Sequence, residues 1–444
     1  MRRGLWLVPK VLPLPEAQRK RCAHGGGPPV INGMLTIKDL VPSPDQDGED
    51  EADEAPHPAA LVPGSTTAKA LLAAWRGDPI VVVDSPPGGG KTRAASTMAA
   101  HLAVRAGANV IAAFPTRMQA KAFAFRIVRQ VPARQVVVKM SGVKKDEIPE
   151  GTASEVPPKG GSVEIRTVAS LARSATNARG ADNILIVDEG YQVVLAELTA
   201  AAQGFRQIAV FGDPGQIGPV VAHDASLWDI SSHGPQSPAP HALCERGDSS
   251  VFHIGETWRL GQETVDVLRA CYSFPFKSRR TARSVHWGDG SALGEIERLS
   301  LPQDERAAAK MIMERVVQLS RCTLKVAGSE ERPVTQADIA VVAARNVQVN
   351  EISSYLSGAG FGDVAVETAD RMQGGEWPIV VALDPCYGGS GPSLHSVDIG
   401  RTCVMLSRHS AHLTWAHDDK WEAVVSPDSA GAKVRRTLMA SPLV

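Results

Sequence analysis

Val81-Val82-Val83-Asp84-Ser85-Pro86-Pro87-Gly88-Gly89-Gly90-Lys91-Thr92, residues 81–92, is the stretch that decides the fold class. Three β-branched residues predict a short buried strand, and the glycine-rich turn before a lysine and a threonine is typical of a P-loop that opens a helix. Backbone N–H groups converge on a phosphate at such a helix start, where the helix dipole also favours negative charge. We expect residues 85–90 to cradle a nucleoside triphosphate, Lys91 to contact its β- and γ-phosphates, and Thr92 to ligate Mg²⁺.

A second motif of the same chemistry follows further along the chain. Residues 184–187 are apolar and predict a buried strand, and Asp188 and Glu189 come directly after them. Asp188 is suited to hold Mg²⁺, directly or through water, and Glu189 to polarise the attacking water. A surface Asp-Glu pair is the alternative, which the preceding apolar strand disfavours. The two motifs together predict an NTP–Mg²⁺ site, with ATP as the expected nucleotide.

Length, composition and charge exclude several classes of protein. The 444 residues exceed one ordinary domain and fit two with a tail. The net charge of −1 shows that the chain is not basic throughout, so any polyanion site must be local. The six cysteines form no CxxC pair or zinc-spaced cluster, which favours a reduced, cytoplasmic compartment. No apolar run is long enough for a bilayer, and prolines interrupt the basic N-terminus, so we expect no membrane span and no secretory signal.

Residues 1–60 have the composition of a tail. The beginning of this stretch is basic, and residues 45–54 are acidic with prolines on either side. Such a composition predicts a solvated, disordered linker. The alternative is that the acidic stretch masks a basic groove when nothing is bound. Protein partners, if the chain has any, are expected at this tail.

Short apolar strands and helices alternate from about residue 61. Such an alternation predicts parallel sheets covered on both faces. Helices are expected over 91–104, 262–272 and 304–319, and an irregular connection over 222–250. The expected strands are 81–84, 109–114, 162–167, 184–188, 208–211, 339–343, 364–367, 379–383 and 403–406. The fold class is therefore α/β, with two domains at 61–255 and 256–444, of which only the first carries a P-loop.

Residues 212–219, Gly-Asp-Pro-Gly-Gln-Ile-Gly-Pro, form another loop after an expected strand. The amide of Gln216 is suited to sense a γ-phosphate, because it hydrogen-bonds without carrying charge. A plain turn rich in proline and glycine explains the same residues equally well.

In their order along the chain, these motifs resemble those of superfamily 1 helicases, from about Leu61 to Leu413. Residues 188–192 (DEGYQ) and 212–219 resemble the second and third motifs of that family. Residues 114–117 and 166–171 resemble two motifs that contact the nucleic-acid backbone in that family. The fourth, fifth and sixth motifs are similar to residues 257–260, 366–376 and 401–408. The resemblance implies two tandem RecA-like domains that work as an NTP-driven motor on single-stranded DNA or RNA.

The resemblance also assigns roles around the nucleotide. Gln216 would couple the γ-phosphate to the nucleic-acid site. Arg259 and Arg408, from the second domain, would act as arginine fingers across a cleft, since charge spreads over the phosphoryl oxygens in the transition state. Trp258 would stack on the adenine and Glu376 would contact the ribose. For a single arginine the ordinary alternative is a surface ion pair, and for a single tryptophan it is a place in the core.

On the nucleic-acid side, the resemblance implies contacts from hydroxyls, backbone N–H groups and one arginine. Such contacts grip a strand without reading its sequence. The implied residues are Pro115, Thr116, Arg117, Thr167 and Thr368. Further basic residues at 126–145 would either extend this path or form a solvated surface, and the sequence favours neither.

The chain departs from the family pattern in three respects. Ser85 replaces the first glycine of the P-loop, no glutamine for reading adenine stands upstream at 65–69, and long insertions are absent. The resemblance points to the 5′→3′ branch, with DNA as the expected track. The alternative function is a nucleotide-dependent switch that binds nucleic acid or a partner without unwinding. A metabolic kinase explains the P-loop but neither residues 212–219 nor the late arginines.

Overall fold

The computed structural model describes residues 56–157, 160–174, 183–221, 226–228, 231, 233–389 and 391–444. The chain divides into two compact units. Unit 1 comprises Met1–Val83, Thr92–Phe211 and Val221–Phe252, as far as these are described, and unit 2 comprises Asp84–Lys91, Gly212–Val220 and His253–Val444. The P-loop and the residues around Gln216 are thus grouped with the second half of the chain. The predicted tail and its partners lie outside the described residues, except for 56–60.

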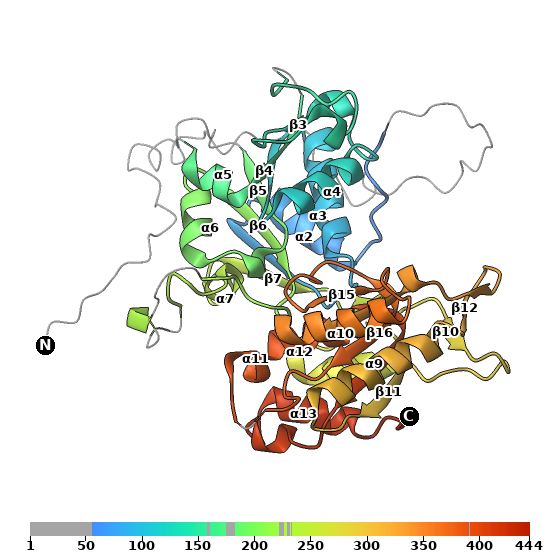
Figure 1. Ribbon diagram of the computed structural model, residues 1–444. Helices are drawn as coiled ribbons and strands as arrows, with labels where there is room; N and C mark the ends of the chain where they lie inside the picture. The colour runs from blue at the N-terminus through green and yellow to red at the C-terminus, as the bar shows by residue number, and fades with distance from the viewer. Residues whose placement is uncertain are drawn as a thin grey trace, which may run out of the picture. The chain divides into compact units, whose positions relative to one another are not determined.

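Unit 1 is built on a seven-stranded sheet (Figure 1). The strand order is β3-β4-β2-β5-β6-β1-β7, and the pairs β3/β4, β4/β2, β2/β5 and β5/β6 are parallel. Its strands are β1 (Ile80–Asp84), β2 (Asn109–Phe114), β3 (Val136–Val138), β4 (Ser162–Thr167), β5 (Ile184–Val187), β6 (Gln207–Gly212) and β7 (Ser249–His253). The β1, β2, β4, β5 and β6 strands confirm the five strands predicted in this half.

Helices cover both faces of this sheet (Figure 1). On one face, α5 (Val168–Arg173), α6 (Leu195–Ala201) and α7 (Ala239–Cys244) share a core with alternate strand residues, such as Val82 and Leu185. The helices α2 (Thr66–Trp75), α3 (Lys91–Ala100) and α4 (Arg117–Ile127) lie on the other, where the ring centroids of Phe114 and Phe123 are 4.8 Å apart. Each such buried aliphatic or aromatic side chain stabilises the fold by roughly 1.5–3 kcal/mol.

Polar side chains set the starts of three of these helices. The hydroxyls of Ser65, Thr116 and Thr167 accept hydrogen bonds from first-turn N–H groups of α2, α4 and α5. Such N-caps satisfy backbone donors that have no partner inside the helix. The helix α3 continues into a π-helical turn at His101–Arg105, so the helix predicted over 91–104 is confirmed.

Unit 2 contains a five-stranded sheet in which all strands run parallel, in the order β11-β17-β16-β14-β15. These strands are β11 (Ile296–Ser300), β14 (Ile339–Ala343), β15 (Ala365–Thr368), β16 (Trp377–Leu383) and β17 (His409–His417). A small antiparallel sheet joins β10 (Arg283–His286), β12 (Thr323–Val326) and β13 (Arg332–Pro333), and β8 (Glu256–Thr257) pairs with β9 (Lys277–Ser278). The α/β fold class with two parallel sheets is therefore confirmed.

The helices of unit 2 form two cores, one on each face of the sheet. On one face, α9 (Glu305–Leu319) and α10 (Asn346–Gly358) pack against Val341 and Val381. On the other, α8 (Gln262–Leu268), α12 (Ile399–Leu406) and α13 (Ala430–Leu438) pack against Val342 and Val380. A short helix, α11 (Leu394–Val397), precedes α12. Period-two alternation along β14 and β16 thus divides their side chains between two apolar layers.

A buried ion pair fastens α13 to the end of β16. The Arg435 guanidinium donates to both carboxylate oxygens of Asp384, at 2.6–3.2 Å, and both side chains are excluded from solvent. The same carboxylate accepts from the backbone N–H of Cys386 at 2.8 Å. Buried charges are tolerated only where such partners replace water.

Two predictions of secondary structure are wrong. Residues 403–406 end the helix α12 and do not form a strand; the strand of this region is β17, which begins at His409. A run of four apolar residues does not distinguish a buried helix from a buried strand. The stretch 222–250, predicted to be irregular, contains α7 and the beginning of β7 in its described part.

Candidate nucleotide site and nucleic-acid surface

Five strands of the seven-stranded sheet end at the edge from which the predicted motifs emerge. The P-loop follows β1, residues 114–117 follow β2, Thr167 ends β4, Asp188 follows β5, and Asp213 follows β6. Backbone hydrogen bonds hold neighbouring loops together, from Ser85 N–H to the Gly212 carbonyl at 2.9 Å and from Asp188 N–H to the Ala113 carbonyl at 3.2 Å. Ligands of open parallel sheets bind outside this carboxyl edge.

The P-loop has a backbone conformation that glycine permits. Gly88 and Gly90 adopt φ of 69° and 87°, and a Cβ on Gly89 would lie 2.5 Å from the Ser85 hydroxyl oxygen. That buried hydroxyl donates to the Pro86 carbonyl at 2.9 Å. The serine at the position of the usual glycine is therefore accommodated by a hydrogen bond within the loop. The loop leads directly into α3, whose first residue is Lys91.

Residues of the predicted fourth motif pack on the P-loop. The Thr257 hydroxyl donates to the Pro87 carbonyl at 2.6 Å, and the Trp258 N–H donates to the Gly88 carbonyl at 3.0 Å. A Cβ on Gly88 would lie 2.4 Å from the Cβ of Arg259, so this contact requires glycine. The Trp258 side chain is 59% exposed, an uncommon state for tryptophan and one suited to stacking on a planar ligand.

Arg259 and Glu376, both predicted to serve the nucleotide, bind each other. Arg259 Nε donates to Glu376 Oε2 at 2.7 Å, and its Nη1 donates to the Ser407 carbonyl at 3.4 Å. Arg283 reaches the second carboxylate oxygen of Glu376 at 3.3 Å. Burial raises the pKa of Glu376, but the two arginines outweigh it and hold that pKa below its ordinary value. Glu376 is thus an ionised bridge between two guanidinium groups.

Arg408, the other predicted arginine finger, is buried. Its guanidinium donates to the Val404 and Gly375 carbonyls at 3.2 and 3.4 Å, and to the Ser407 hydroxyl at 3.0 Å. Only 1% of Arg408 is exposed to solvent. A role for Arg408 at a phosphate therefore requires these hydrogen bonds to be exchanged.

Asp188 and Glu189 differ in their surroundings. Asp188 is buried, and one carboxylate oxygen accepts from the Glu189 N–H at 3.0 Å. Glu189 has φ of 57° and ψ of 40°, and is the one non-glycine residue with positive φ in the described chain. This conformation costs on the order of 1 kcal/mol. Gly190 fixes the turn, because a Cβ there would lie 2.2 Å from Val210 Cγ1.

Two oxygen donors are predicted to hold Mg²⁺, the Thr92 hydroxyl and the Asp188 carboxylate. Thr92 lies in the first turn of α3 and Asp188 follows β5, both within unit 1. The described residues contain no group of three or more histidine, cysteine or acidic side chains able to hold a metal. One hydroxyl and one carboxylate suit Mg²⁺, which keeps several waters and binds through phosphate oxygens.

Gln216 lies in a network that the sequence only partly indicated. Its amide donates to Asp213 at 2.8 Å, and Gln373 donates to its Oε1 at 3.4 Å. The Tyr272 hydroxyl also donates to Asp213, at 2.8 Å. Burial, with Asp213 and Cys403 nearby, raises the pKa of Tyr272 well above its ordinary value, so the hydroxyl keeps its proton. Tyr272 has no motif of its own and could not be found from the sequence.

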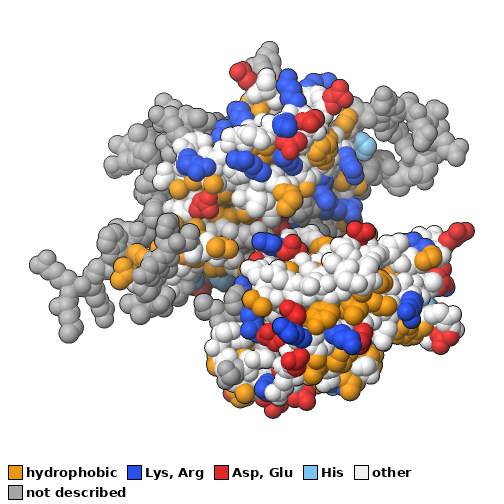
Figure 2. All heavy atoms as spheres, viewed as in Figure 1, with side chains coloured by type: hydrophobic (Ala, Val, Ile, Leu, Met, Phe, Trp, Pro, Cys, Tyr) orange, Lys and Arg blue, Asp and Glu red, His pale blue; other side chains and the backbone are white. Residues whose placement is uncertain are grey.

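Two of the predicted nucleic-acid contacts of unit 1 lie at one cavity. Arg117 and Thr167, from two separate motifs, line a cavity of about 280 Å³ together with Ser141, Ser170 and Arg173. Arg117 Nη2 donates to the Ser141 hydroxyl at 3.4 Å. Figure 2 shows further Lys and Arg side chains over the face of unit 1 that carries α4 and α5. Hydroxyls and guanidinium groups so arranged are suited to phosphate.

The other three predicted contact residues differ in exposure. Thr116 is exposed before α4, and Pro115 precedes it at the end of β2. Thr368 ends β15 in unit 2 and is 8% exposed, so its hydroxyl is accessible only in part.

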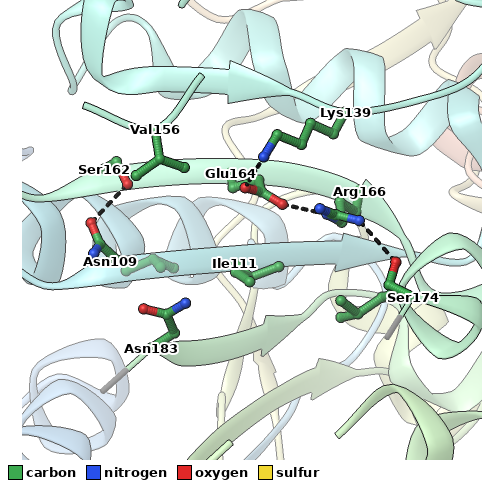
Figure 3. A pocket seen from close by; sticks show the side chains of 11 residues that line it. Asn109, Ile111, Lys139, Val156, Ser162, Glu164, Arg166, Ser174 and Asn183 are labelled. Carbon is green, nitrogen blue, oxygen red and sulfur yellow. Dashed lines mark hydrogen bonds and ion pairs between the residues drawn. The ribbon is translucent and has the colours of Figure 1, made fainter. Parts of the chain in front are cut away.

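A second cavity, of about 250 Å³, lies over β2 and β4 (Figure 3). Glu164 stands in its wall and pairs with Lys139 at 2.9 Å and with Arg166. Arg166 also donates to the Ser174 hydroxyl at 3.0 Å. Lys139 and Arg166 are therefore already paired with a carboxylate. Arg117 is better placed than these two side chains to bind a phosphate.

The fold and this site define a P-loop nucleoside-triphosphatase with two parallel-sheet units. Residues 81–281 match the model of the viral superfamily 1 RNA helicase core domain. This part of the chain is thus similar to the core domain of superfamily 1 helicases. No curated protein matches the sequence. None of the described helices is long and apolar enough to cross a bilayer.

Three solved structures are similar to the chain at low sequence identity. The PRRSV helicase has 15% identity and a TM-score of 0.41, with 80% of this chain and 54% of that chain covered. The arterivirus nonstructural protein 10 helicase has 16% identity and a TM-score of 0.43, covering 80% and 63%. Its complex with DNA has 15% identity and a TM-score of 0.45, covering 83% and 65%. The chain thus spans between half and two thirds of the length of these helicases.

Proposed function

We propose that this protein is an NTP-driven motor that moves along single-stranded nucleic acid in the 5′→3′ direction, with ATP as its fuel. The observation that carries the proposal is the arrangement of five motifs, which follow or end the strands β1, β2, β4, β5 and β6 of one sheet at the edge where ligands of parallel sheets bind. The match of residues 81–281 to a helicase core supports it. DNA is the track expected from the sequence, whereas the matching family model is of RNA helicases.

In this proposal Lys91 neutralises the β- and γ-phosphates, and Thr92 and Asp188 hold Mg²⁺, which would polarise the phosphoryl group. Glu189 accepts a proton from the attacking water, and Gln216 responds to the γ-phosphate. Arg259 and Arg408 supply positive charge to the transition state, which for such arginines is worth about 10³–10⁵ in rate. The exposed ring of Trp258 stacks on the base, and Glu376 contacts the ribose once Arg259 has moved away.

Nucleic acid is proposed to bind along Pro115, Thr116, Arg117, Thr167 and Thr368. The cavity shared by Arg117 and Thr167 supports this path, because it combines a guanidinium group and hydroxyls from two motifs. Hydroxyls and a backbone path of this kind do not read bases, so we expect little sequence preference.

The test is NTP hydrolysis measured with and without oligo(dT) and oligo(U), beside Lys91→Ala. Strong stimulation by one polymer, lost in the variant, is the expected result and identifies the track. Partial duplexes with a 5′ or a 3′ overhang then test polarity. Hydrolysis that is indifferent to both polymers would contradict a nucleic-acid motor.

A switch without unwinding activity is the second candidate. One observation favours it: between α4 and β4 the described chain adds only β3 and two short 3₁₀ turns. Separation of nucleic-acid strands usually needs a larger accessory element that inserts between them. The described chain adds only these short elements to its core. Strand displacement at saturating NTP separates the two candidates, because a switch binds and hydrolyses without releasing a strand.

A further inference from the structure

A chain of side-chain hydrogen bonds in unit 1 joins Thr116 to Glu189. The Thr116 hydroxyl donates to Gln119 Oε1 at 2.8 Å. Gln119 Nε2 donates to Gln192 Oε1 at 3.2 Å, and Gln192 Nε2 donates to Glu189 Oε2 at 3.2 Å. Its two ends are a residue proposed to touch nucleic acid and the residue proposed to accept the proton of the attacking water.

The direction of every link is fixed by chemistry. A carboxylate only accepts, so Gln192 must present its NH₂ group to Glu189 and its oxygen to Gln119. Gln119 must then present its NH₂ group to Gln192, and its oxygen to Thr116. The Thr116 N–H donates to that same oxygen at 3.1 Å, so Gln119 Oε1 accepts from both donors of Thr116. A flip of either amide would break the hydrogen bonds on both sides of that glutamine.

The backbone holds the ends of this chain in place. Thr116 and Gln119 form the capping box at the start of α4, and the Gln192 N–H donates to the Glu189 carbonyl at 2.9 Å. Thr116 is exposed, while both glutamines and Glu189 are half-buried. The chain thus leads from solvent to the strained residue at the end of β5.

Nucleic acid and this chain compete for a single hydrogen. A threonine hydroxyl has one hydrogen to donate, and here Gln119 receives it. A phosphate oxygen only accepts, so it can bind this hydroxyl only by taking that hydrogen from Gln119. We propose that Gln119 and Gln192 form a relay that restrains Glu189 while the strand is absent and releases it when the strand engages Thr116. The relay rests on the proposed function, and both glutamines are positioning residues.

Linkage determines the expected effects. If strand binding breaks the relay, the relay must oppose strand binding by the same factor by which the strand favours release. Gln119→Met and Gln192→Met remove the links while keeping chain length and most volume. We expect each to raise strand-free hydrolysis about threefold to tenfold, with the strand-saturated rate within about twofold of wild type. The stimulation ratio falls accordingly, and neither variant binds oligonucleotide more weakly.

The double variant gives the decisive measurement. Two links in series release the same residue, so Gln119→Met with Gln192→Met should raise the basal rate no further than one substitution does. Gln348→Met is the matched control, because Gln348 occupies the same capping-box position in α10 and its Oε1 accepts from the Arg345 N–H at 3.2 Å. We expect this control to keep the wild-type stimulation ratio.

The measurements are steady-state hydrolysis with and without saturating oligo(dT) or oligo(U), oligonucleotide binding, and thermal unfolding of each variant. Unchanged basal rates in both single variants would overturn the relay. So would basal and stimulated rates that fall together, or effects that multiply in the double variant. In these cases a stimulated wild-type enzyme leaves the motor proposal intact. A wild-type enzyme that neither polymer stimulates overturns both.

Discussion

Glu376 is expected to restrain Arg259, the proposed arginine finger, and its charge can be removed almost without change of shape. In Glu376→Gln the side chain still offers an oxygen to Arg259 Nε, now 2.7 Å from Glu376 Oε2, but no longer a negative charge. The guanidinium of Arg259 is then freer to turn to a phosphate bound at the P-loop. Arg259 lies next to this loop, because its Cβ and backbone N fill the space beside Gly88. We expect the turnover number of NTP hydrolysis to rise.

The structure limits the size of this effect. The Glu376 side chain is 38% exposed and that of Arg259 17%, so solvent screens the pair. Pairs of this kind contribute about 0.2–1 kcal/mol. A barrier lowered by 1 kcal/mol corresponds to a rate increase of about fivefold. The expected rise in kcat is therefore about 1.4-fold to fivefold, and it should be absent in the Arg259→Ala background.

The assay is steady-state hydrolysis at saturating oligonucleotide, with kcat and KM determined separately. If Glu376 also contacts the ribose, KM rises in the same variant without affecting the kcat argument. Arg283→Ala is the control with the opposite sign, because it leaves Glu376 to Arg259 alone and should lower kcat. A kcat for Glu376→Gln that equals or falls below wild type, in a variant that unfolds at the wild-type temperature, would refute the restraint.

Two predictions concern the stability of unit 2. Asp384→Asn leaves the buried Arg435 guanidinium without its countercharge and should lower the free energy of unfolding by about 3–5 kcal/mol in urea titrations, whereas Asp384→Leu with Arg435→Met should recover much of the loss. Burial, opposed by a hydrogen bond to a backbone carbonyl, lowers the pKa of His412 from 6.5 to about 3. Below pH 6.5 the unfolded chain binds a proton that the folded chain rejects. Stability should therefore fall by about 1.3 kcal/mol between pH 7 and pH 5.5, and His412→Gln should remove this part of the pH dependence.

The parts of the site that could be predicted are those with local signals. Residues 81–92 combine a β-branched strand, a glycine turn and a helix start within one short stretch, and the structure has all three. Asp188 and the loop around Gln216 could be predicted for the same reason, because each directly follows an apolar strand. Such motifs are recognisable because the backbone geometry that the chemistry needs also restricts the residues that can form it.

The wrong assignment of residues 403–406 has a different origin. The true strand, β17, contains buried polar side chains such as His409, His412 and Thr414, which do not read as an apolar core strand. Partners distant in sequence hydrogen-bond to them: His409 bonds to Thr264 at 2.9 Å, and His412 to the Gly294 carbonyl at 2.7 Å. A polar residue enters a core only if such partners exist, and periodicity carries no information about them.

The glutamine relay could not have been predicted for the same reason, and this bears on how the site works. Gln119 follows one motif and Gln192 ends another, so either glutamine alone reads as a helix cap or a turn residue. Their meaning depends on the 3.2 Å contact between them, which joins residues 73 positions apart in sequence. The parallel pairing of β2 with β5 creates that contact, because it brings the ends of both strands to one edge. The sheet that assembles the proposed phosphate site therefore also brings Thr116, the proposed nucleic-acid contact, within two side chains of Glu189, the proposed base. Coupling between the two sites then needs no long-range conformational change in unit 1, only the exchange of a hydroxyl hydrogen.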